Sequence, residues 1–454
     1  MLYIAKILEK DGDNVTVIDF SAESFEEKKL IDEVKTADVV GITVLSFSLK
    51  NSIEIIKLIK KVKPKVKVII GGPHCTLFPK KALEETQADI SVQGDGESII
   101  IKIKKAIVGD SAFSEIPGIY FRENEHIKKG ASLKLIQSLD SIPFPARDLV
   151  KKYNYGREYN PKIKKGEFTA FIASRGCPFR CKFCSRNSIS MRKYRSRSAK
   201  NILEELKELH RHGYKYVAFE DDSFLSNKKQ VYEIFDRIIE ERLDMKFIIA
   251  AARVDAAEKE LFQKMKKAGV THMQFGLESG NQDILDFYNK KTTVENIKYA
   301  VNLSHKMGFF TIGSFILGAP FETKKHFERT INFAKTLPID SVSFLPLDYV
   351  AGSDLWCSAV QQGKISEEEY LIHAGSERVL GLFKQEEIVD YCIKAHRDFY
   401  LRPRFILRLF IKSLKNDDLG FLQSYLSLFF SNMREGFKFL GLMSRKNRSV
   451  GPTF

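Results

Sequence analysis

The sequence predicts an α/β protein with two successive strand–helix domains and a basic helical tail. In residues 1–110, short β-branched segments alternate with segments of helical spacing, which is typical of a parallel sheet covered by helices. Residues 168–347 repeat strand–helix units, and this repetition indicates an incomplete six-unit (β/α) barrel. The chain of 454 residues is too long for one ordinary core, so more than one domain is expected.

The composition is that of a globular protein, with 44% hydrophobic and 29% charged residues. Residues 1–10 lack the features of a signal peptide, and no apolar run reaches the about 18 residues that span a bilayer. We therefore expect a cytoplasmic protein. Six cysteines do not make a disulfide framework, but three of them fall within eight residues. Cys75, Cys357 and Cys392 are scattered, and we expect them to be packed thiols.

The first domain is predicted to carry a ligand site at one edge of its sheet. Ligands of such sheets bind beyond the carboxyl ends of the strands, where glycines let the backbone approach a ligand. Those ends are residues 46–48, 71–74 and 94–97. Tight turns without a ligand would explain the glycines equally well. We expect strands at residues 15–19, 39–45, 66–70 and 90–92, and helices at residues 1–10, 52–61, 79–86 and 97–106.

Several stretches of this domain resemble the cobalamin-binding domain that precedes many radical S-adenosylmethionine (SAM) enzymes. They are D-V-V-G-I-T-V, I-I-G-G-P-H and Q-G-D-G-E, and S-I-P-F-P-A-R-D-L resembles the linker that ends the domain. The resemblance implies a Rossmann-like (flavodoxin-like) domain over residues 1–137 and a linker over residues 138–161. It also implies that cobalamin is bound by loop residues, namely Ser46, Phe47, Gly71, Gly72, Gly94, Gly96 and Glu97.

Two features depart from the pattern of that family. The D-x-H-x-x-G signature, with which other cobalamin domains ligate cobalt, is absent, so we do not expect His74 to be a cobalt ligand. Residues 1–10 already read as the first helix, which Asp11 and Gly12 end, so the first strand of the sheet is missing. Since that strand normally lies in the middle of the sheet, we hypothesise that the true start lies upstream.

The most informative motif is C-P-F-R-C-K-F-C, which follows the first predicted strand of the second domain. Its spacing allows Cys177, Cys181 and Cys184 to hold three corners of a [4Fe–4S] cluster. The fourth iron then has no protein ligand and can bind a small molecule. A zinc site would need a fourth ligand, and none follows before His210 and His212. A C-x-x-C redox pair would leave Cys177 unexplained.

This motif resembles that of the radical SAM superfamily. The resemblance implies that SAM chelates the open iron and that an electron from the cluster cleaves the sulfonium. The resulting 5′-deoxyadenosyl radical then abstracts a hydrogen from the substrate. It also implies a radical SAM core over residues 162–385, in which Phe183 contacts the adenine. Matches at later strand ends imply further SAM contacts, namely Glu220, Arg253, Glu278, Ser279 and Gly318.

The barrel is expected to place these residues at the carboxyl ends of its strands. After the second strand, the carboxylates of Glu220, Asp221 and Asp222 could hold an ammonium group by charge-assisted hydrogen bonds. Alternatively, Asp222 and Ser223 cap the next helix. We expect strands at residues 168–174, 216–219, 247–251, 273–280, 311–318 and 341–346.

A basic run of Arg192, Lys193, Arg195 and Arg197 follows the cysteine motif. It could bind phosphate. Such runs are more often solvated surface that leads into a helix, and we favour this second interpretation. Ser198 is the expected N-cap of that helix.

The tail is basic and apolar. Residues 401–454 contain ten Lys or Arg and three Asp or Glu, which contributes +7 to the net charge of +15. Residues 386–454 could form interfacial amphipathic helices on anionic lipid. They could equally be helices docked on the barrel, with Arg and Lys stems that cover apolar surface. The tail resembles that of relatives acting on lipids or tetrapyrroles, which hints at an apolar substrate.

Taken together, the resemblances imply a radical SAM enzyme that uses a [4Fe–4S] cluster, SAM and cobalamin to methylate an unactivated carbon. An oxidoreductase or cyclase of the same fold, without methyl transfer, stays open. A methylthiotransferase is disfavoured, because that family carries three further cysteines in its first domain and this first domain has only Cys75. From another class, a cobalamin-binding sensor or a nucleic-acid binder is conceivable, but no nucleic-acid module is visible.

The expected partners follow from this chemistry. They are a small-molecule or lipid substrate and an electron donor such as ferredoxin or flavodoxin. The basic tail adds an expected peripheral contact with a membrane.

Overall fold

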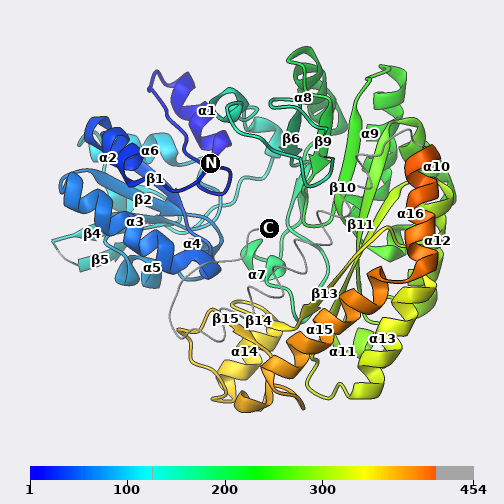
Figure 1. Cartoon of the computed structure of the whole chain (residues 1–454). Coiled ribbons are helices and arrows are strands. Elements are labelled where there is room, and N and C mark those ends of the chain that lie inside the picture. Colours follow the sequence, from blue (N-terminus) through cyan, green and yellow to red (C-terminus); the bar gives the residue numbers. More distant parts are fainter. Residues whose placement is uncertain (125, 161, 416–454) are drawn as a thin grey trace. The chain divides into compact units, whose positions relative to one another are not determined.

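A computed structural model describes residues 1–124, 126–160 and 162–415, which fall into two compact units (Figure 1). Unit 1 comprises Met1–Tyr153 and Ser188–Arg195, and unit 2 comprises Asn154–Asn187 and the described residues from Ser196 onward. Each unit has a sheet of its own. The break after Tyr153 lies within the expected linker, and the expected domain boundaries themselves stay predictions.

Unit 1 contains a five-stranded sheet in the order β1-β2-β3-β4-β5 among the described residues. The first three strands are parallel, as the alternating pattern predicted, and β4 and β5 add an antiparallel hairpin. Every residue of β3 is buried, as expected for a strand with both faces covered. The strands are β1 (Val39–Thr43), β2 (Lys67–Gly71), β3 (Ile90–Val92), β4 (Ile119–Glu123) and β5 (His126–Lys129).

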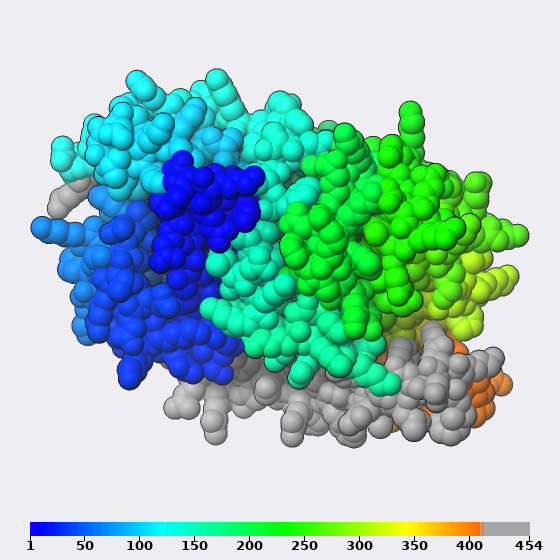
Figure 2. Space-filling view, turned by 90° about the horizontal axis from the view of Figure 1, so that it is seen from above, coloured from blue at the N-terminus to red at the C-terminus, as the bar shows by residue number. Residues whose placement is uncertain are grey.

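Four helices of unit 1, namely α1, α3, α5 and α6, begin and end within three residues of the predicted limits, whereas α2 and α4 were not predicted. Ile4, Ile7 and Leu8 of the first helix pack on the apolar core that lies under β3 and the sixth helix. In the space-filling view, the dark-blue N-terminal residues form part of the surface of this unit (Figure 2). The helices are α1 (Leu2–Lys10), α2 (Glu27–Thr36), α3 (Leu49–Val62), α4 (Pro73–Leu77), α5 (Pro79–Glu85) and α6 (Ile100–Ile107).

The strand predicted at residues 15–19 is wrong, because this segment has no ladder partner in the structure. In the 2-1-3-4-5 order of flavodoxin-like sheets, the second strand pairs only with the first. Among the described residues no strand lies beyond β1, so the segment has nothing to pair with. Val17 instead packs with Ala5 and Ala146 in a small apolar cluster.

Unit 2 is built on an open, all-parallel sheet of six described strands in the order β13-β12-β11-β10-β9-β6. This order confirms the predicted incomplete barrel, in which successive strands lie side by side. Each strand contributes at least one buried phenylalanine, namely Phe168 and Phe171 in the first strand and Phe219, Phe247, Phe275, Phe315 and Phe344 in the others. The strands are β6 (Phe168–Phe171), β9 (Tyr216–Phe219), β10 (Lys246–Ala252), β11 (Val270–Glu278), β12 (Phe310–Leu317) and β13 (Ser341–Pro346).

Helices of unit 2 connect these strands and then continue past the last one. Ser198 caps the first long helix, because its side chain accepts a hydrogen bond from the Asn201 amide, as predicted. A short antiparallel pair, β14 (Asp348–Val350) and β15 (Leu371–His373), follows β13. The helices are α8 (Ala199–Arg211), α9 (Lys228–Glu240), α10 (Lys259–Lys267), α11 (Gln282–Phe287), α12 (Val294–Lys306), α13 (Lys324–Thr336), α14 (Asp354–Gln361), α15 (Gln385–Tyr400) and α16 (Pro403–Lys415).

Candidate active site

The loop that carries Cys177, Cys181 and Cys184 follows β6, at the carboxyl end of the parallel sheet. We call residues 176–185 the cluster loop. All three cysteines are partly exposed, and besides burial the charge of nearby Cys181 raises the pKa of Cys177 and of Cys184. Burial raises the pKa of the Cys184 thiol to about 11, so a metal must displace its proton on binding. Three neighbouring thiols on one loop fit a [4Fe–4S] cluster with one open iron.

Arg253, which follows β10, is buried against this loop. Its Nη1 lies 3.8 Å from the Cys181 Sγ atom, and its guanidinium stacks over the Phe179 ring at 3.6 Å from the centroid. Asp255 accepts from Nη2 at 2.8 Å and neutralises part of the charge. Arg253 thus places a positive charge beside the position that a negatively charged cluster would occupy. Its expected contact with the SAM carboxylate stays a prediction.

Two carboxylates that follow β9 bind the start of the cluster loop and the residues just before it. Asp221 is buried and accepts from the Ala173 amide at 3.1 Å and from the Ser174 hydroxyl at 2.5 Å. Asp222 accepts from the Gly176 amide at 3.2 Å. Burial raises the pKa of Asp221 to about 7, although its hydrogen bonds oppose that rise. Sequence reasoning missed this supporting role, for which the tandem carboxylates after β9 were the available signal.

The expectation that Asp222 and Ser223 cap the next helix is wrong. A 3-10 turn, Phe224–Ser226, separates them from α9, and Asn227 is the N-cap of that helix. The physical reason is that Asp222 is already engaged, since it pairs with Arg186 at 3.3 Å and binds the cluster loop. Glu220 is exposed and accepts from the Tyr159 hydroxyl at 3.1 Å.

The remaining expected SAM contacts lie at the ends of β11 and β12. Glu278 is buried with a positive φ of 61°, and its Oε1 is 2.5 Å from the Lys290 Nζ atom. The Ser279 hydroxyl instead faces Thr330, at 3.2 Å between the two oxygens. Gly318 has a φ of 109°, which favours glycine. That these residues bind SAM stays a prediction, and Lys290 was not predicted at all.

The backbone after β12 is fixed by Glu322. Its Oε2 accepts from the Gly318 amide at 2.7 Å and from the Ala319 amide at 2.9 Å. The side chain is fully buried, and its Oε1 has no hydrogen-bond partner among the described residues. Burial therefore raises the pKa of Glu322 to about 7, against the lowering effect of the two amides. A neutral acid holds this strand end over part of the physiological pH range.

In unit 1, the expected cobalamin residues lie at the carboxyl ends of β1, β2 and β3. The Ser46 Oγ atom lies 3.1 Å from the Nδ1 of His74, which is fully buried and also pairs with Glu85 at 3.4 Å. Phe47 is 50% exposed, as suits a residue that would meet a flat ligand. These loops are where the fold places a ligand, and the individual contacts stay predictions.

Glycine at position 72 is required by its own surroundings. Its φ is 100°, and a Cβ there would lie 3.0 Å from Thr43 Cγ2 and 3.1 Å from the Val44 oxygen. At Gly94, with a φ of 77°, a Cβ would meet the leucine side chains at 133 and 135. The tight-turn explanation therefore accounts for both glycines, and their expected contact with cobalamin stays a prediction.

The favoured interpretation of the basic run holds only for Arg192 and Lys193, which are exposed. Arg195 forms an ion pair with Asp95 and donates to the Ile136 carbonyl at 2.7 Å. Arg197 is buried and pairs with Glu205 at 2.5 Å. Solvated surface is thus wrong for Arg195 and Arg197, because their partners come from distant sequence positions or the next helix.

Family models match both halves of this arrangement. The model for the radical SAM superfamily matches residues 171–334, and that for the B12 binding domain matches residues 1–104. An uncharacterised methyltransferase of Pyrococcus horikoshii is 32% identical over 414 residues, which cover 90% of this chain and 88% of the relative. The chain belongs to the radical SAM enzymes that carry a cobalamin-binding domain.

Other members of this cobalamin-dependent radical SAM family differ in reaction. An anaerobic magnesium-protoporphyrin IX monomethyl ester cyclase of Cereibacter sphaeroides is 30% identical, over 73% of this chain and 55% of the cyclase. The cobalamin-dependent SAM radical enzyme OxsB, solved with aqua-cobalamin and SAM bound, shares the fold with a TM-score of 0.70 and 17% identity. That match covers 100% of this chain and 74% of OxsB.

Membership confirms the expected cofactors and enzyme class. The protein is a radical SAM enzyme that uses a [4Fe–4S] cluster, SAM and cobalamin. Within the described residues, no helix combines the length and the apolar character needed to cross a membrane.

Proposed function

We propose that the protein transfers a methyl group to an unactivated carbon of a small, apolar substrate. The observation that carries the proposal is the combination, in one chain, of a cobalamin-binding domain with a three-cysteine cluster loop. The 32% identical methyltransferase relative, matched over 90% of this chain, supports it. When bound, the cluster with SAM supplies a 5′-deoxyadenosyl radical, and cobalamin supplies the methyl group.

The side chains divide this work between holding and positioning. Cys177, Cys181 and Cys184 would hold the cluster, while Asp221 fixes the strand that leads into their loop. Glu322 fixes the Gly318 backbone, which would flank the adenine. Phe183, Glu220, Arg253, Glu278 and Ser279 are proposed to complete the SAM site, and Ser46, Phe47, Gly71, Gly72, Gly94, Gly96 and Glu97 the cobalamin site.

The test is anaerobic reconstitution with iron, sulfide and cobalamin, incubation with SAM and a reduced electron donor, and mass spectrometry of the products. Methyl transfer predicts both 5′-deoxyadenosine and S-adenosylhomocysteine, because one SAM is cleaved and a second donates its methyl group. Cys181→Ala should abolish both products. Cys357→Ala is the matched control, since Cys357 is an exposed cysteine outside the cluster loop. 5′-Deoxyadenosine without S-adenosylhomocysteine would contradict the proposal.

That contradicting result would favour the second candidate, an oxidoreductase or cyclase. The cyclase relative, 30% identical over 73% of this chain, is the observation in its favour. A tetrapyrrole or lipid substrate fits both candidates. Each also needs an electron donor, for which we propose a ferredoxin or flavodoxin, and omission of the donor should stop 5′-deoxyadenosine formation.

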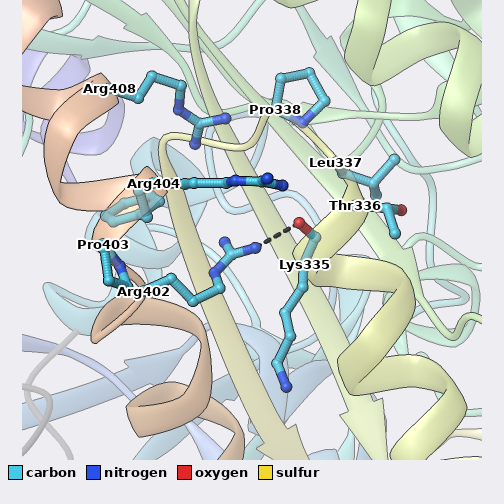
Figure 3. Close-up of a pocket in the computed structure, with 9 residues that line it drawn as sticks. Lys335, Thr336, Leu337, Pro338, Arg402, Pro403, Arg404 and Arg408 are labelled. Carbon is cyan, nitrogen blue, oxygen red and sulfur yellow. Dashed lines mark hydrogen bonds between the residues drawn. The ribbon is translucent and has the colours of Figure 1, made fainter.

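We further propose that α16 contacts anionic membrane lipid. Its exposed apolar residues include Ile406, Leu407 and Ile411, of which Leu407 is 59% exposed. Three arginines of the same region line a cavity of about 640 Å³ beside the end of α13 (Figure 3). The lining residues are Lys335, Thr336, Leu337, Pro338, Arg402, Pro403, Arg404, Phe405 and Arg408. Cations beside exposed apolar side chains suit an anionic interface.

This cavity lies at the amino ends of the strands, because Leu337 and Pro338 precede β13. It is therefore separate from the cluster loop. Vesicle flotation with and without anionic lipid tests the contact. Leu407→Asp should reduce binding, whereas Leu382→Asp, at another exposed leucine, should not. Equal binding of both variants and the parent would contradict it. The tail beyond Lys415, where further apolar residues were expected, lies outside the described residues.

A further inference from the structure

The turn after α11, residues 288–291, contacts the cluster loop through two hydrogen bonds and a ring contact. The Tyr288 carbonyl accepts from the Lys182 amide at 2.9 Å, and the Asn289 side chain donates to the Arg180 carbonyl at 2.8 Å. The Tyr288 ring lies 5.1 Å from that of Phe183. One turn thus contacts three consecutive parts of the loop, although about a hundred residues separate them in sequence.

The turn and its partner strand adopt backbone conformations that side chains other than glycine rarely take. Asn289 and Lys291 have φ values of 54° and 58°, and Glu278 has one of 61°. Such conformations cost free energy, and they persist only where the surroundings fix them, most often at functional sites. Lys290 lies between the two residues of positive φ, and its side chain is buried whereas that of Lys291 is exposed.

Lys290 is an internal cation. Its side chain is only 8% exposed, and its Nζ lies 2.5 Å from the Glu278 Oε1 atom and 5.9 Å from the centre of the Phe183 ring. Gly276 provides the space, because a Cβ at that position would lie 3.0 Å from the Nζ atom. Burial of an ammonium group is unfavourable unless it is paired, so the position is maintained against a cost.

This ammonium is one of two buried positive charges beside the cluster loop, Lys290 near Phe183 and Arg253 near Cys181. Arg253 donates to the Lys290 carbonyl at 2.5 Å and reaches the Cys181 sulfur at 3.8 Å. Burial lowers the pKa of Lys290, but the negative charges of Glu278 and of Cys181 outweigh burial and raise it. Each of the two cations has one acidic partner, Asp255 for Arg253 and Glu278 for Lys290. Reduction adds one negative charge to a cluster, so buried cations favour the reduced form.

We propose that Lys290 is a positioning residue of the radical reaction, whose buried ammonium raises the reduction potential of the cluster and whose pairing holds Glu278. The proposal rests on the cluster chemistry of the family and not on the fate of the radical. One electron from a ferredoxin- or flavodoxin-type donor enters the cluster, as in the established reaction. Lys290 makes that transfer more favourable and takes no part in bond making.

The test is an EPR-monitored redox titration of the reconstituted full-length enzyme without substrate. Lys290→Met should shift the midpoint potential to a more negative value, and Glu278→Gln should shift it to a more positive value. Lys290→Arg keeps the positive charge and should retain a midpoint potential close to that of the parent. Lys291→Met is the matched control, because Lys291 lies in the same turn but is exposed to screening solvent, and it should leave the potential unchanged.

Opposite shifts from the two charge variants would separate an electrostatic role from a structural one. A merely structural role would lower the iron content of both variants without moving the potential of the clusters that remain. Unchanged potentials in Lys290→Met and Glu278→Gln, or shifts of the same sign, would overturn the proposal. Because no methyl product is measured, failure of the proposed methyl transfer would leave this result intact.

Discussion

Single buried acids set the shape of the site in unit 2. Asp221 and Glu322 are both buried, and each binds two backbone amides, one at the entry to the cluster loop and the other at the end of β12. Burial raises the pKa of each to about 7. A carboxyl group that accepts backbone bonds can therefore fix a loop without adding a full negative charge beside a negatively charged cluster.

Glu322 predicts a pH dependence of stability. Its pKa is raised from 4.5 to about 7 in the folded chain, so the folded state binds the proton more tightly than the unfolded state does. Its contribution to the free energy of unfolding is complete below about pH 4.5 and is lost as pH rises to about 7. Between these pH values the parent should lose up to about 3 kcal/mol of unfolding free energy through Glu322. Glu322→Gln stays neutral at both pH values and should not show this part of the loss.

Urea unfolding of the full chain at pH 5 and pH 8 measures that difference. The groups that face Glu322 are the amides of Gly318 and Ala319, Tyr288, Asp283 and Cys392. Glu328→Gln is the control, because Glu328 is exposed on α13. If Glu322→Gln and the parent lose the same stability between the two pH values, the raised pKa is not what couples Glu322 to folding.

Asp221 predicts a loss of cluster rather than of fold. In Asp221→Asn, the side-chain oxygen can keep the bonds that Oδ1 accepts from Ser174, but the amide nitrogen replaces Oδ2 and faces the Ala173 amide as a second donor. A buried donor left without its acceptor costs about 1–3 kcal/mol. We expect less iron per chain after reconstitution. Asp244→Asn, at an exposed position, should bind iron like the parent. Parent-like iron in both variants would show that the support is dispensable.

At the scale of elements, β-branched runs and helical spacing predicted the parallel strands and most helices of both units. Residues 15–19 carried the same local pattern but lacked a partner strand, and no local pattern reports a partner. The β4–β5 hairpin was missed for lack of a clear alternation in its short strands.

The site divides in the same way. The cysteines and Glu278 lie in contiguous motifs next to strand ends, so the sequence identified them. Asp221 and Lys290 act through contacts with segments 48 and 12 residues away, which no local pattern reports. Glu322 binds amides only three and four residues away, but its role depends on the burial of its side chain, which the local sequence does not show. Arg195 and Arg197 show the converse, because a surface-like run of charges is partly buried once its distant acids are in place.

The turn between β2 and α4 predicts a difference between two glycines. Gly72 and Gly109 have φ values of 100° and 93°, so alanine strains both, by about 1 kcal/mol. At Gly72 the new Cβ would also meet Thr43 and the Val44 oxygen, whereas at Gly109 nothing lies within 4 Å. Gly72→Ala should therefore lower the melting temperature more and weaken cobalamin binding in an absorbance titration. Equal effects would refute the close contact.

At the scale of the whole molecule, each unit has its own sheet and buried core. The cobalamin loops lie in unit 1 and the cluster loop in unit 2, so each cofactor depends on a fold that the other does not supply. A substitution that disrupts the core of one unit should therefore leave the core of the other unit folded.

This separation predicts that the two cofactors can be removed one at a time. The triple substitution of Cys177, Cys181 and Cys184 by Ala should abolish iron binding and 5′-deoxyadenosine, yet retain the cobalamin absorbance of the parent. Gly72→Ala should bind cobalamin more weakly and form less S-adenosylhomocysteine at a given cobalamin concentration, yet retain the iron content of the parent and still cleave SAM. Cys357→Ala, at an exposed cysteine, controls for loss of a thiol. Loss of both cofactors in either variant would mean that the units do not fold independently, and retained S-adenosylhomocysteine without cobalamin would mean that the methyl group travels by another route.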